Sequence, residues 1–236
     1  MADLSSTLPV VRLDAQVYAL SATGRSLADD VLRVIQDASY TYEDVIDLFN
    51  DCLMEIAGSH LLPELETFRD VYTVPNVNSI AMPADYHRNL RYCHSITQNA
   101  QRKIYGSRSL LMQHFSNLNQ VGRVIGVAVN GRELYYQRVP SDAEQLHINY
   151  YRYPEKLVSA DDKPTCIEWH LAKKLLKAYA LKELYAEIED DETGKVNVTR
   201  YEKKYEQALA ELTVFIGPEE DVPDEFDEAI DWEAMA

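Results

Sequence analysis

Apolar residues recur along the chain with two different periods, and the change of period divides the chain into three parts. From Ser26 to Gly58 they fall three or four positions apart, as on one face of a helix. In residues 63–158 they often alternate with polar residues, as in a half-buried strand. From Pro164 to Phe215 the helical period returns. The pattern predicts an α+β fold, in which N- and C-terminal helices form a bundle around an inserted antiparallel β-sheet.

The N-terminal helical part contains signals for two helices. Ser26 is a candidate N-cap for a short one. Thr41 followed by Asp44 resembles a capping box, with Asp in place of the preferred Glu. The helix that starts there should end at Gly58. Its apolar stripe consists of Val45, Leu48, Phe49, Cys52, Leu53 and Ile56.

The strongest local signal in the central part is Asn130-Gly131 between two apolar runs. Both central residues of a type I′ turn need positive φ, so this pair predicts a hairpin of residues 124–129 and 134–139. A third, alternating run at residues 146–153 completes a predicted three-stranded antiparallel meander. We also expect short strands near residues 71–74, 80–82, 90–97 and 103–105, and a helix over 107–115.

Two further helices are predicted after the meander. The first starts at Pro164-Thr165 and is broken by the polar loop at residues 189–194. Its predicted apolar face is a single stripe of Ile167, Leu171, Leu175, Tyr179, Leu184 and Ile188. The second spans residues 197–215, with Tyr201, Tyr205, Leu209 and Leu212 on one face. Such stripes are buried only against one another or against the sheet.

Composition adds a few constraints. No apolar run reaches about 18 residues, so no membrane-spanning helix is expected. The N-terminus lacks the basic start of a secretion signal. Three widely spaced cysteines favour reduced thiols and a cytoplasmic setting. The 16 tyrosines against 5 phenylalanines suit either subunit contacts or simple strand propensity.

The formal charge of −16 is unevenly distributed. Residues 86–156 hold ten Arg/Lys and four Asp/Glu, a net of +6, so the remainder carries −22. This separation favours copies that touch through opposite surfaces, although strand-rich segments also simply contain fewer acids. The candidate subunit-interface residues are Arg132, Tyr135, Tyr136, Arg138 and Arg152.

The C-terminal end, residues 217–236, has a composition of its own. From Pro218 onward it contains nine acids, two prolines and no base, as a solvated tail does. Apolar residues are nevertheless scattered through it, as in a segment that becomes ordered on a partner. The candidate docking residues are Val222, Phe226, Ile230 and Trp232. A plain solvated tail is the alternative.

Signatures of chemistry are missing. The chain has no GxSxG elbow, phosphate-binding glycine loop, GxGxxG or HExxH motif. Cys166 and His170 lie four apart on a predicted helix, but no second pair with metal-ligand spacing supports them. We therefore expect no enzyme activity, no catalytic residues, no cofactor and no metal. A nucleic-acid-binding module that uses arginines and tyrosines of the sheet is an alternative function, although the overall acidity opposes it.

The order of elements resembles the head–tail connector (adaptor) proteins of tailed bacteriophages over residues 26–215. A proline-marked segment from Leu62 leads into a strand that ends near Val74, and the turn MPADY follows at residues 82–86. The meander then ends in INYYRYPEKL, similar to the exit segment of many adaptors. The start of the next helix, at Pro164, is similar to that in tail-tube gatekeeper proteins of short-tailed phages.

The resemblance implies a structural virion protein, assembled in the bacterial host cytoplasm. Its copies would form a ring in the phage neck, commonly of twelve, beneath the portal protein. The ring would offer a platform for tail or nozzle proteins and continue the DNA channel, without sequence-specific DNA binding. The domains implied are an arm (1–25), N-terminal helices (26–62), a β-rich insertion (63–158), C-terminal helices (159–216) and a portal-docking tail (217–236). Another virion ring or a tail-completion component is the alternative within structural proteins.

Overall fold

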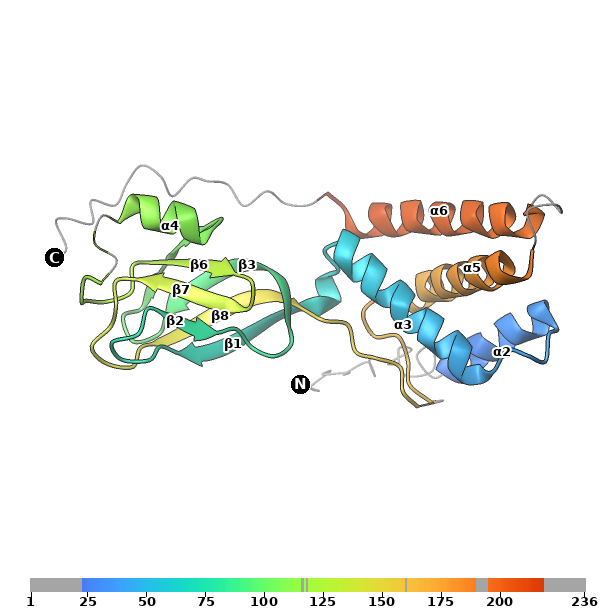
Figure 1. The fold of residues 1–236 in the computed structure, drawn as a ribbon, viewed down its shortest axis with the longest axis horizontal. Helices are drawn as coiled ribbons and strands as arrows, with labels where there is room; N and C mark the ends of the chain where they lie inside the picture. The colour runs from blue at the N-terminus through green and yellow to red at the C-terminus, as the bar shows by residue number, and fades with distance from the viewer. Residues whose placement is uncertain (1–22, 116, 118, 160, 190–194, 219–236) are drawn as a thin grey trace, which may run out of the picture. The chain divides into compact units, whose positions relative to one another are not determined.

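The computed structural model describes residues 23–115, 117, 119–159, 161–189 and 195–218 of the chain. The described residues divide into two compact units, which we call the helical unit (within 23–53 and 155–212) and the sandwich unit (within 54–154 and 213–218). The chain thus leaves the helical unit within one helix and returns to it after Pro154. Helices and two sheets are both prominent (Figure 1), so the predicted α+β class is confirmed.

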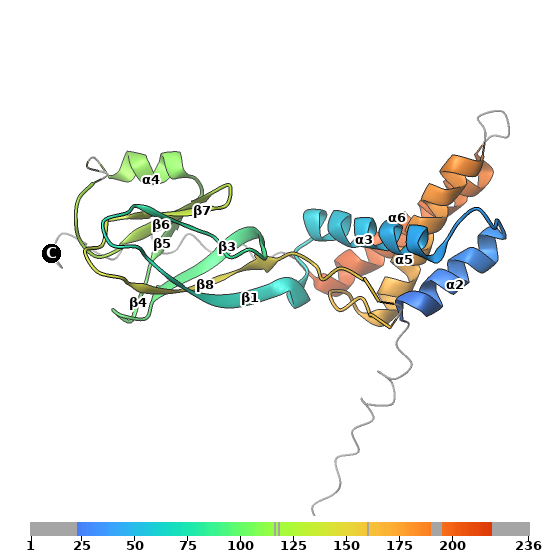
Figure 2. The same cartoon turned by 60° about the horizontal axis from the view of Figure 1, so that its bottom comes forward.

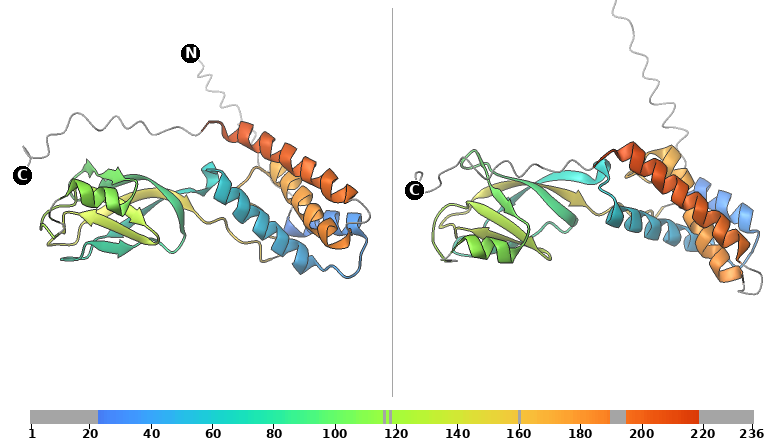
Figure 3. Two further views of the ribbon diagram at one scale, coloured as in Figure 1. Left: turned by 45° about the horizontal axis from the view of Figure 1, so that its top comes forward. Right: turned by 90° about the horizontal axis from the view of Figure 1, so that it is seen from above.

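The helical unit is built around helix α5 (Trp169–Ile188), together with α2 (Gly24–Ile35), α3 (Tyr42–Ser59) and α6 (Val196–Ile216). Buried residues point in most directions around the axis of α5, so the prediction of a single apolar stripe was too narrow. They are Leu171, Ala172, Leu175, Leu176, Ala178, Tyr179, Ala180, Leu181 and Leu184. Figure 3 shows α6 running beside α5, where Tyr185 stacks on Tyr201 and Tyr179 meets Tyr205 edge to face.

The helix starts agree with the sequence signals to different degrees. The capping box at α3 is confirmed, because the Thr41 N–H donates to Asp44 Oδ2 at 2.7 Å and the Asp44 N–H to Thr41 Oγ1 at 3.4 Å. The N-cap of α2 is Thr23 and not Ser26, whose N–H instead donates to Thr23 Oγ1. Helix α5 begins at Trp169 and not at Pro164, since the intervening residues bury two side chains in a non-helical segment.

Two four-stranded sheets pack against each other in the sandwich unit. Sheet A has the order β1 (Glu66–Tyr72), β8 (Gln145–Arg152), β3 (Tyr86–Ser95), β4 (Ala100–Gln101). Sheet B has the order β2 (Ser79–Ala81), β7 (Glu133–Gln137), β6 (Gly126–Asn130), β5 (Lys103–Tyr105). Among these strands, β5 and β6 pair in parallel, and the other pairs are antiparallel. A short 3-10 turn (Pro63–Leu65) precedes β1, and helix α4 (Arg108–His114) lies against sheet B (Figure 2).

The structure confirms the hairpin of the predicted meander but not the position of its third strand. β6 and β7 form the expected hairpin, but β8 pairs with β1 and β3 in the other sheet, so the prediction of three adjacent strands was wrong. The turn also differs, because Asn130 pairs with Glu133 and the loop residues are Gly131 and Arg132. Only Gly131 has positive φ there, at 63°, which rules out a type I′ turn.

The core of the sandwich unit comes from the inner faces of both sheets. β8 turns alternate residues inward, as the sequence pattern predicted, and these meet residues of β3, β6 and β7. The buried cluster is Met82, Tyr86, Cys93, Val124, Val127, Leu134, Tyr136, Leu146, Ile148 and Tyr150. The strand alternation was therefore correct, and only the partner of β8 was misassigned.

Candidate assembly surface

The end of the β6–β7 hairpin presents an arginine on a fixed backbone. The Arg132 carbonyl accepts a hydrogen bond from the Met82 N–H at 2.9 Å, which ties the turn to the segment after β2. The Arg132 side chain is exposed, and its guanidinium lies 5.8 Å from the centre of the Tyr153 ring. The positive charge is thus held at a defined position on the surface.

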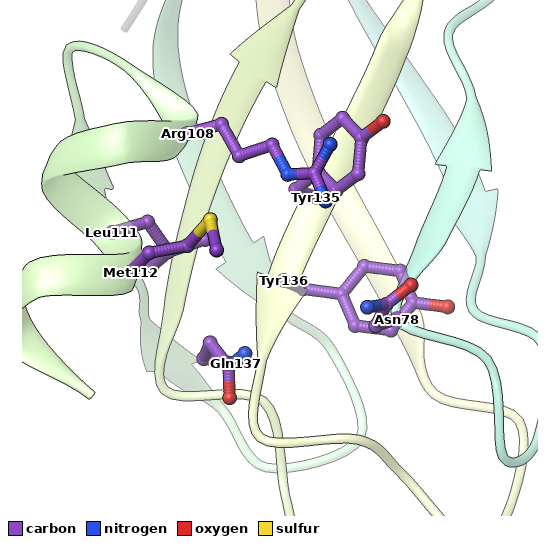
Figure 4. Close-up of a pocket in the computed structure, with 7 residues that line it drawn as sticks. All are labelled: Asn78, Arg108, Leu111, Met112, Tyr135, Tyr136 and Gln137. Carbon is purple, nitrogen blue, oxygen red and sulfur yellow. The ribbon is translucent and has the colours of Figure 1, made fainter. Parts of the chain in front are cut away.

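A small pocket on the outer side of sheet B holds a second positive charge. The Arg108 guanidinium, from α4, lies 4.3 Å from the centre of the Tyr135 ring, and Figure 4 shows the two side chains facing each other. The Tyr135 hydroxyl donates to Glu133, and this hydrogen bond to a carboxylate raises the pKa of Tyr135. The pocket is lined by Asn78, Arg108, Leu111, Met112, Tyr135, Tyr136 and Gln137.

The remaining candidate interface residues do not join this surface. Tyr136 is 1% exposed and lies in the core, where its hydroxyl oxygen accepts the Val74 N–H at 3.3 Å. Arg138 is half-buried against Gly122, at the opposite end of β7 from Arg132 and about 20 Å away along an extended strand. Arg152 is half-buried at the end of β8, opposite Tyr86. The five candidates therefore occupy several places, not one patch.

Helix α3, most of which belongs to the helical unit, carries a contrasting surface. Carboxylates recur every four residues on its exposed side, at Glu43, Asp47, Asp51 and Glu55, and we call this the acidic stripe. Like charges four apart on a helix each cost roughly 0.2–0.5 kcal/mol. One face of α3 is therefore negative at the cost of a small loss of helix stability.

Several other features of the described residues bear on chemistry. None of the described helices is long and apolar enough to cross a membrane. Within the same residues, no group of three or more His, Cys, Asp or Glu side chains is placed to hold a metal ion. Cys52, Cys93 and Cys166 are all buried, and burial raises the pKa of Cys93 to about 12. The docking candidates Val222, Phe226, Ile230 and Trp232 lie outside the described residues, as do residues 1–22 of the predicted arm.

Two contributors to the surface were missed from the sequence. Arg108 was not among the candidates, because it contacts Tyr135, a residue 27 positions further along the chain on a different element. Nothing in the local pattern marks that contact. The acidic stripe did have a signal, because the spacing of four was visible once a helix was assigned to this segment.

Comparison with known proteins identifies the family. Residues 22–230 match the model of the SU10 adaptor protein family. The chain belongs to this family, and it is accordingly a structural adaptor protein of a phage virion, of the head–tail adaptor kind. No curated protein matches the chain.

Proposed function

We propose that this SU10-family adaptor forms a closed ring in the phage neck, which joins the portal to the tail and continues the DNA channel. The observation that carries the proposal is the separation of charge between the two units. Residues 24–53 of the helical unit contain seven acids and two arginines, whereas residues 66–152 of the sandwich unit contain ten bases and six acids. A ring needs two different surfaces that fit each other, and opposite charges help to select them.

The two surfaces of the proposed subunit contact are specific. On one copy, Arg108 and Arg132 lie on the sandwich unit, each held over a tyrosine ring. On the next copy, the acidic stripe of α3 supplies the negative side. Such a contact is heterologous, so each copy uses both surfaces and the chain of contacts closes into a ring. Twelve copies is the number that the likeness to neck adaptors implies.

A charge swap tests this contact. Replacing Arg108 and Arg132 with Glu should abolish ring formation, measured by multi-angle light scattering and electron microscopy. Replacing Asp47 and Asp51 with Lys in the same chain should restore it, because the attraction is re-created with reversed signs. The control is the double variant Lys203→Glu with Lys204→Glu on α6, where both lysines are exposed. It changes the net charge by the same amount and should leave the ring intact. Normal rings from the Arg108/Arg132 variant would refute the contact.

The acidic tail is proposed to dock on the portal. Its anchors would be Val222, Phe226, Ile230 and Trp232, buried in a groove of the portal with the acids around them. A chain that stops at Gly217 should still form rings but should bind portal particles more weakly than the full chain does. Unchanged binding in a pull-down with purified portal would refute tail docking.

The channel surface is proposed to let DNA pass without sequence-specific binding. The formal charge of −16 makes the protein as a whole repel phosphate, which favours sliding over retention. Purified rings should therefore show only weak binding to duplex DNA at physiological salt. Tight binding that weakens steeply with salt would instead favour a nucleic-acid-binding module.

A further inference from the structure

Strand β1 forms an open edge of sheet A. It stands at the end of the order β1-β8-β3-β4, and no strand in the described part of the chain pairs with its other side. At seven residues it is long for an edge strand, and it contains neither proline nor glycine. Proteins commonly shorten, bend or cover such edges, because exposed backbone groups recruit other strands. β1 has no bulge in its pairing with β8, so the edge is straight and regular.

The backbone groups that face this edge follow from the pairing. The Thr73 N–H donates to the Glu144 carbonyl at 2.9 Å, immediately beyond the pair of Tyr72 with Gln145. In an antiparallel ladder every second residue points its N–H and C=O toward the partner strand. Thr67, Arg69 and Val71 therefore bond to β8, whereas the N–H and C=O groups of Glu66, Phe68, Asp70 and Tyr72 point outward.

The side chains along the edge also fit an added strand. Phe68 and Tyr72 are 56% and 60% exposed on the outer face, and Phe68 stacks on His147 with ring centres 5.3 Å apart. The charges that normally repel a new strand are already engaged, because Asp70 contacts His147 at 2.6 Å and Arg69 contacts Asp85 at 3.0 Å. An incoming strand would meet two exposed aromatic rings and few unpaired charges.

One segment of this chain outside the described residues has the matching pattern. From Val11 to Ala19 the sequence VRLDAQVYA has an apolar residue at every second position, with Arg, Asp, Gln and Tyr between them. Such alternation is typical of a strand with one buried face. The apolar side is Val11, Leu13, Ala15, Val17 and Ala19. Nine residues are enough to cover the seven of β1, and only residues 20–22 separate the segment from the described chain at Thr23.

We propose that residues 11–19 of one copy add to β1 of the neighbouring copy as a fifth strand of sheet A, with their apolar side over Phe68 and Tyr72. This inference rests on the proposed ring, because an arm passed from each copy to the next is one more heterologous contact. Backbone hydrogen bonds between the added segment and β1 would hold the two strands together. The alternation puts the apolar side chains of the segment on one common face of the sheet.

Amide hydrogen exchange resolved to single residues tests the proposal in the full-length protein. The amides of Phe68, Asp70 and Tyr72 should be protected in the wild type, whereas those of Arg69 and Val71 bond to β8 and serve as internal controls. Ala15→Pro places a residue without an N–H inside the segment and should speed exchange of the first set at least about tenfold, with the second set unchanged. Ser5→Pro, outside the segment, should have no effect.

The outcomes separate this inference from the proposed ring. If the amides of Phe68, Asp70 and Tyr72 exchange at the same rate in Ala15→Pro and in Ser5→Pro, residues 11–19 do not pair with β1. This conclusion holds whatever light scattering shows about the ring. If the protection of Phe68 persists after dilution to monomers, the strand comes from the same chain and the exchange between copies is wrong. Rings formed by Ala15→Pro that have lost the protection support the pairing and leave the ring proposal standing.

Discussion

Each unit contains an ion-pair cluster, and the two clusters differ in their exposure to water. In the helical unit, Asp30 lies 3.2 Å from Lys173 and 3.8 Å from Lys177, and all three side chains remain at least 24% exposed. In the sandwich unit, Arg102 contacts Glu144 at 3.0 Å, and these side chains are only 2% and 5% exposed. One ion-pair cluster is therefore hydrated and the other is removed from water.

The buried pair in the sandwich unit belongs to a network at the point where the chain changes sheets. Glu144 accepts from Arg102 through Oε1 and from the Val124 N–H through Oε2. The Glu144 backbone also exchanges two hydrogen bonds with Thr73, at 2.8 and 2.9 Å. The network thus joins the residue after β1 to those before β6 and β8.

The largest expected effect comes from opening the buried pair. Arg102→Met should destabilise the sandwich unit by about 3–5 kcal/mol, because Glu144 is left buried without its partner. The matched change in the helical unit, Lys173→Met, should cost no more than about 1 kcal/mol, since that pair is partly exposed. Amide hydrogen exchange of strands β6, β7 and β8 at increasing urea concentration measures the sandwich unit. Trp169 fluorescence in a Trp232→Phe background reports on the helical unit.

A double variant sharpens this result. Arg102→Met with Glu144→Leu removes both charges, so the combined cost should be smaller than that of Arg102→Met alone. Equal losses from Arg102→Met and Lys173→Met would show that the burial of the pair has no energetic consequence.

The next largest effect on stability is expected where a glycine has no room for a side chain. A Cβ added at Gly126 in β6 would lie 2.7 Å from Tyr105 Cε2 and 3.3 Å from Leu111 Cδ1. Gly126→Ala should therefore destabilise the sandwich unit by about 1–3 kcal/mol, because Tyr105 of β5 and Leu111 of α4 must move away from β6. Gly58→Ala in α3 is the control: nothing lies within 4 Å of its added Cβ, and alanine stabilises a helix relative to glycine. A thermal melt in which both variants behave alike would contradict this difference.

The sequence predicted features that depend on neighbouring residues. The capping box of Thr41 and Asp44, the end of α5 at Ile188 and the hairpin around Gly131 each depend on residues within a few positions of one another. The partner of β8 was missed, because alternation fixes which face a strand buries and not which strand lies beside it. The pair of Arg102 with Glu144 joins residues 42 positions apart, and no local pattern marks it.

The candidate site shows the same limit. Arg132 was proposed as an interface residue, and the structure places its exposed side chain at the turn of the β6–β7 hairpin. Tyr135 and Tyr136 were both proposed as surface residues, although adjacent residues of a strand point to opposite faces. The structure places Tyr136 in the core. Burial of Leu134 already implied this, since Leu134 and Tyr136 share a face.

A smaller effect is expected at the start of α3. Thr41→Ala removes the hydroxyl that accepts the Asp44 N–H and donates to its carboxylate, so the helical unit should lose about 1 kcal/mol. Thr41→Ser keeps the hydroxyl and should restore most of the loss. Trp169 fluorescence during urea unfolding measures both. A serine variant as unstable as the alanine variant would show that the methyl group of Thr41, and not its cap, is responsible.

The smallest effect is a pH dependence at the exposed ion pairs of the helical unit. Burial alone would raise the pKa of Asp30, but the hydrogen bond from Lys173 and the charges of Lys177, Lys173 and Arg33 outweigh it and hold the pKa below its ordinary value. A carboxylate with a depressed pKa stabilises the folded state above its unfolded pKa, and this contribution disappears as the pH falls through the folded pKa.

Asp30→Asn should therefore cost up to about 1 kcal/mol near neutral pH, and the difference from wild type should shrink below about pH 4. Raising the salt concentration at neutral pH should also reduce it, because the pairs are hydrated. The neighbouring Asp29→Asn is the control for the change in net charge, since Asp29 is exposed on the same helix. A difference that stays constant between pH 7 and 3 would mean that Asp30 acts through its shape and not its charge, which would remove the contrast with the buried Arg102–Glu144 pair.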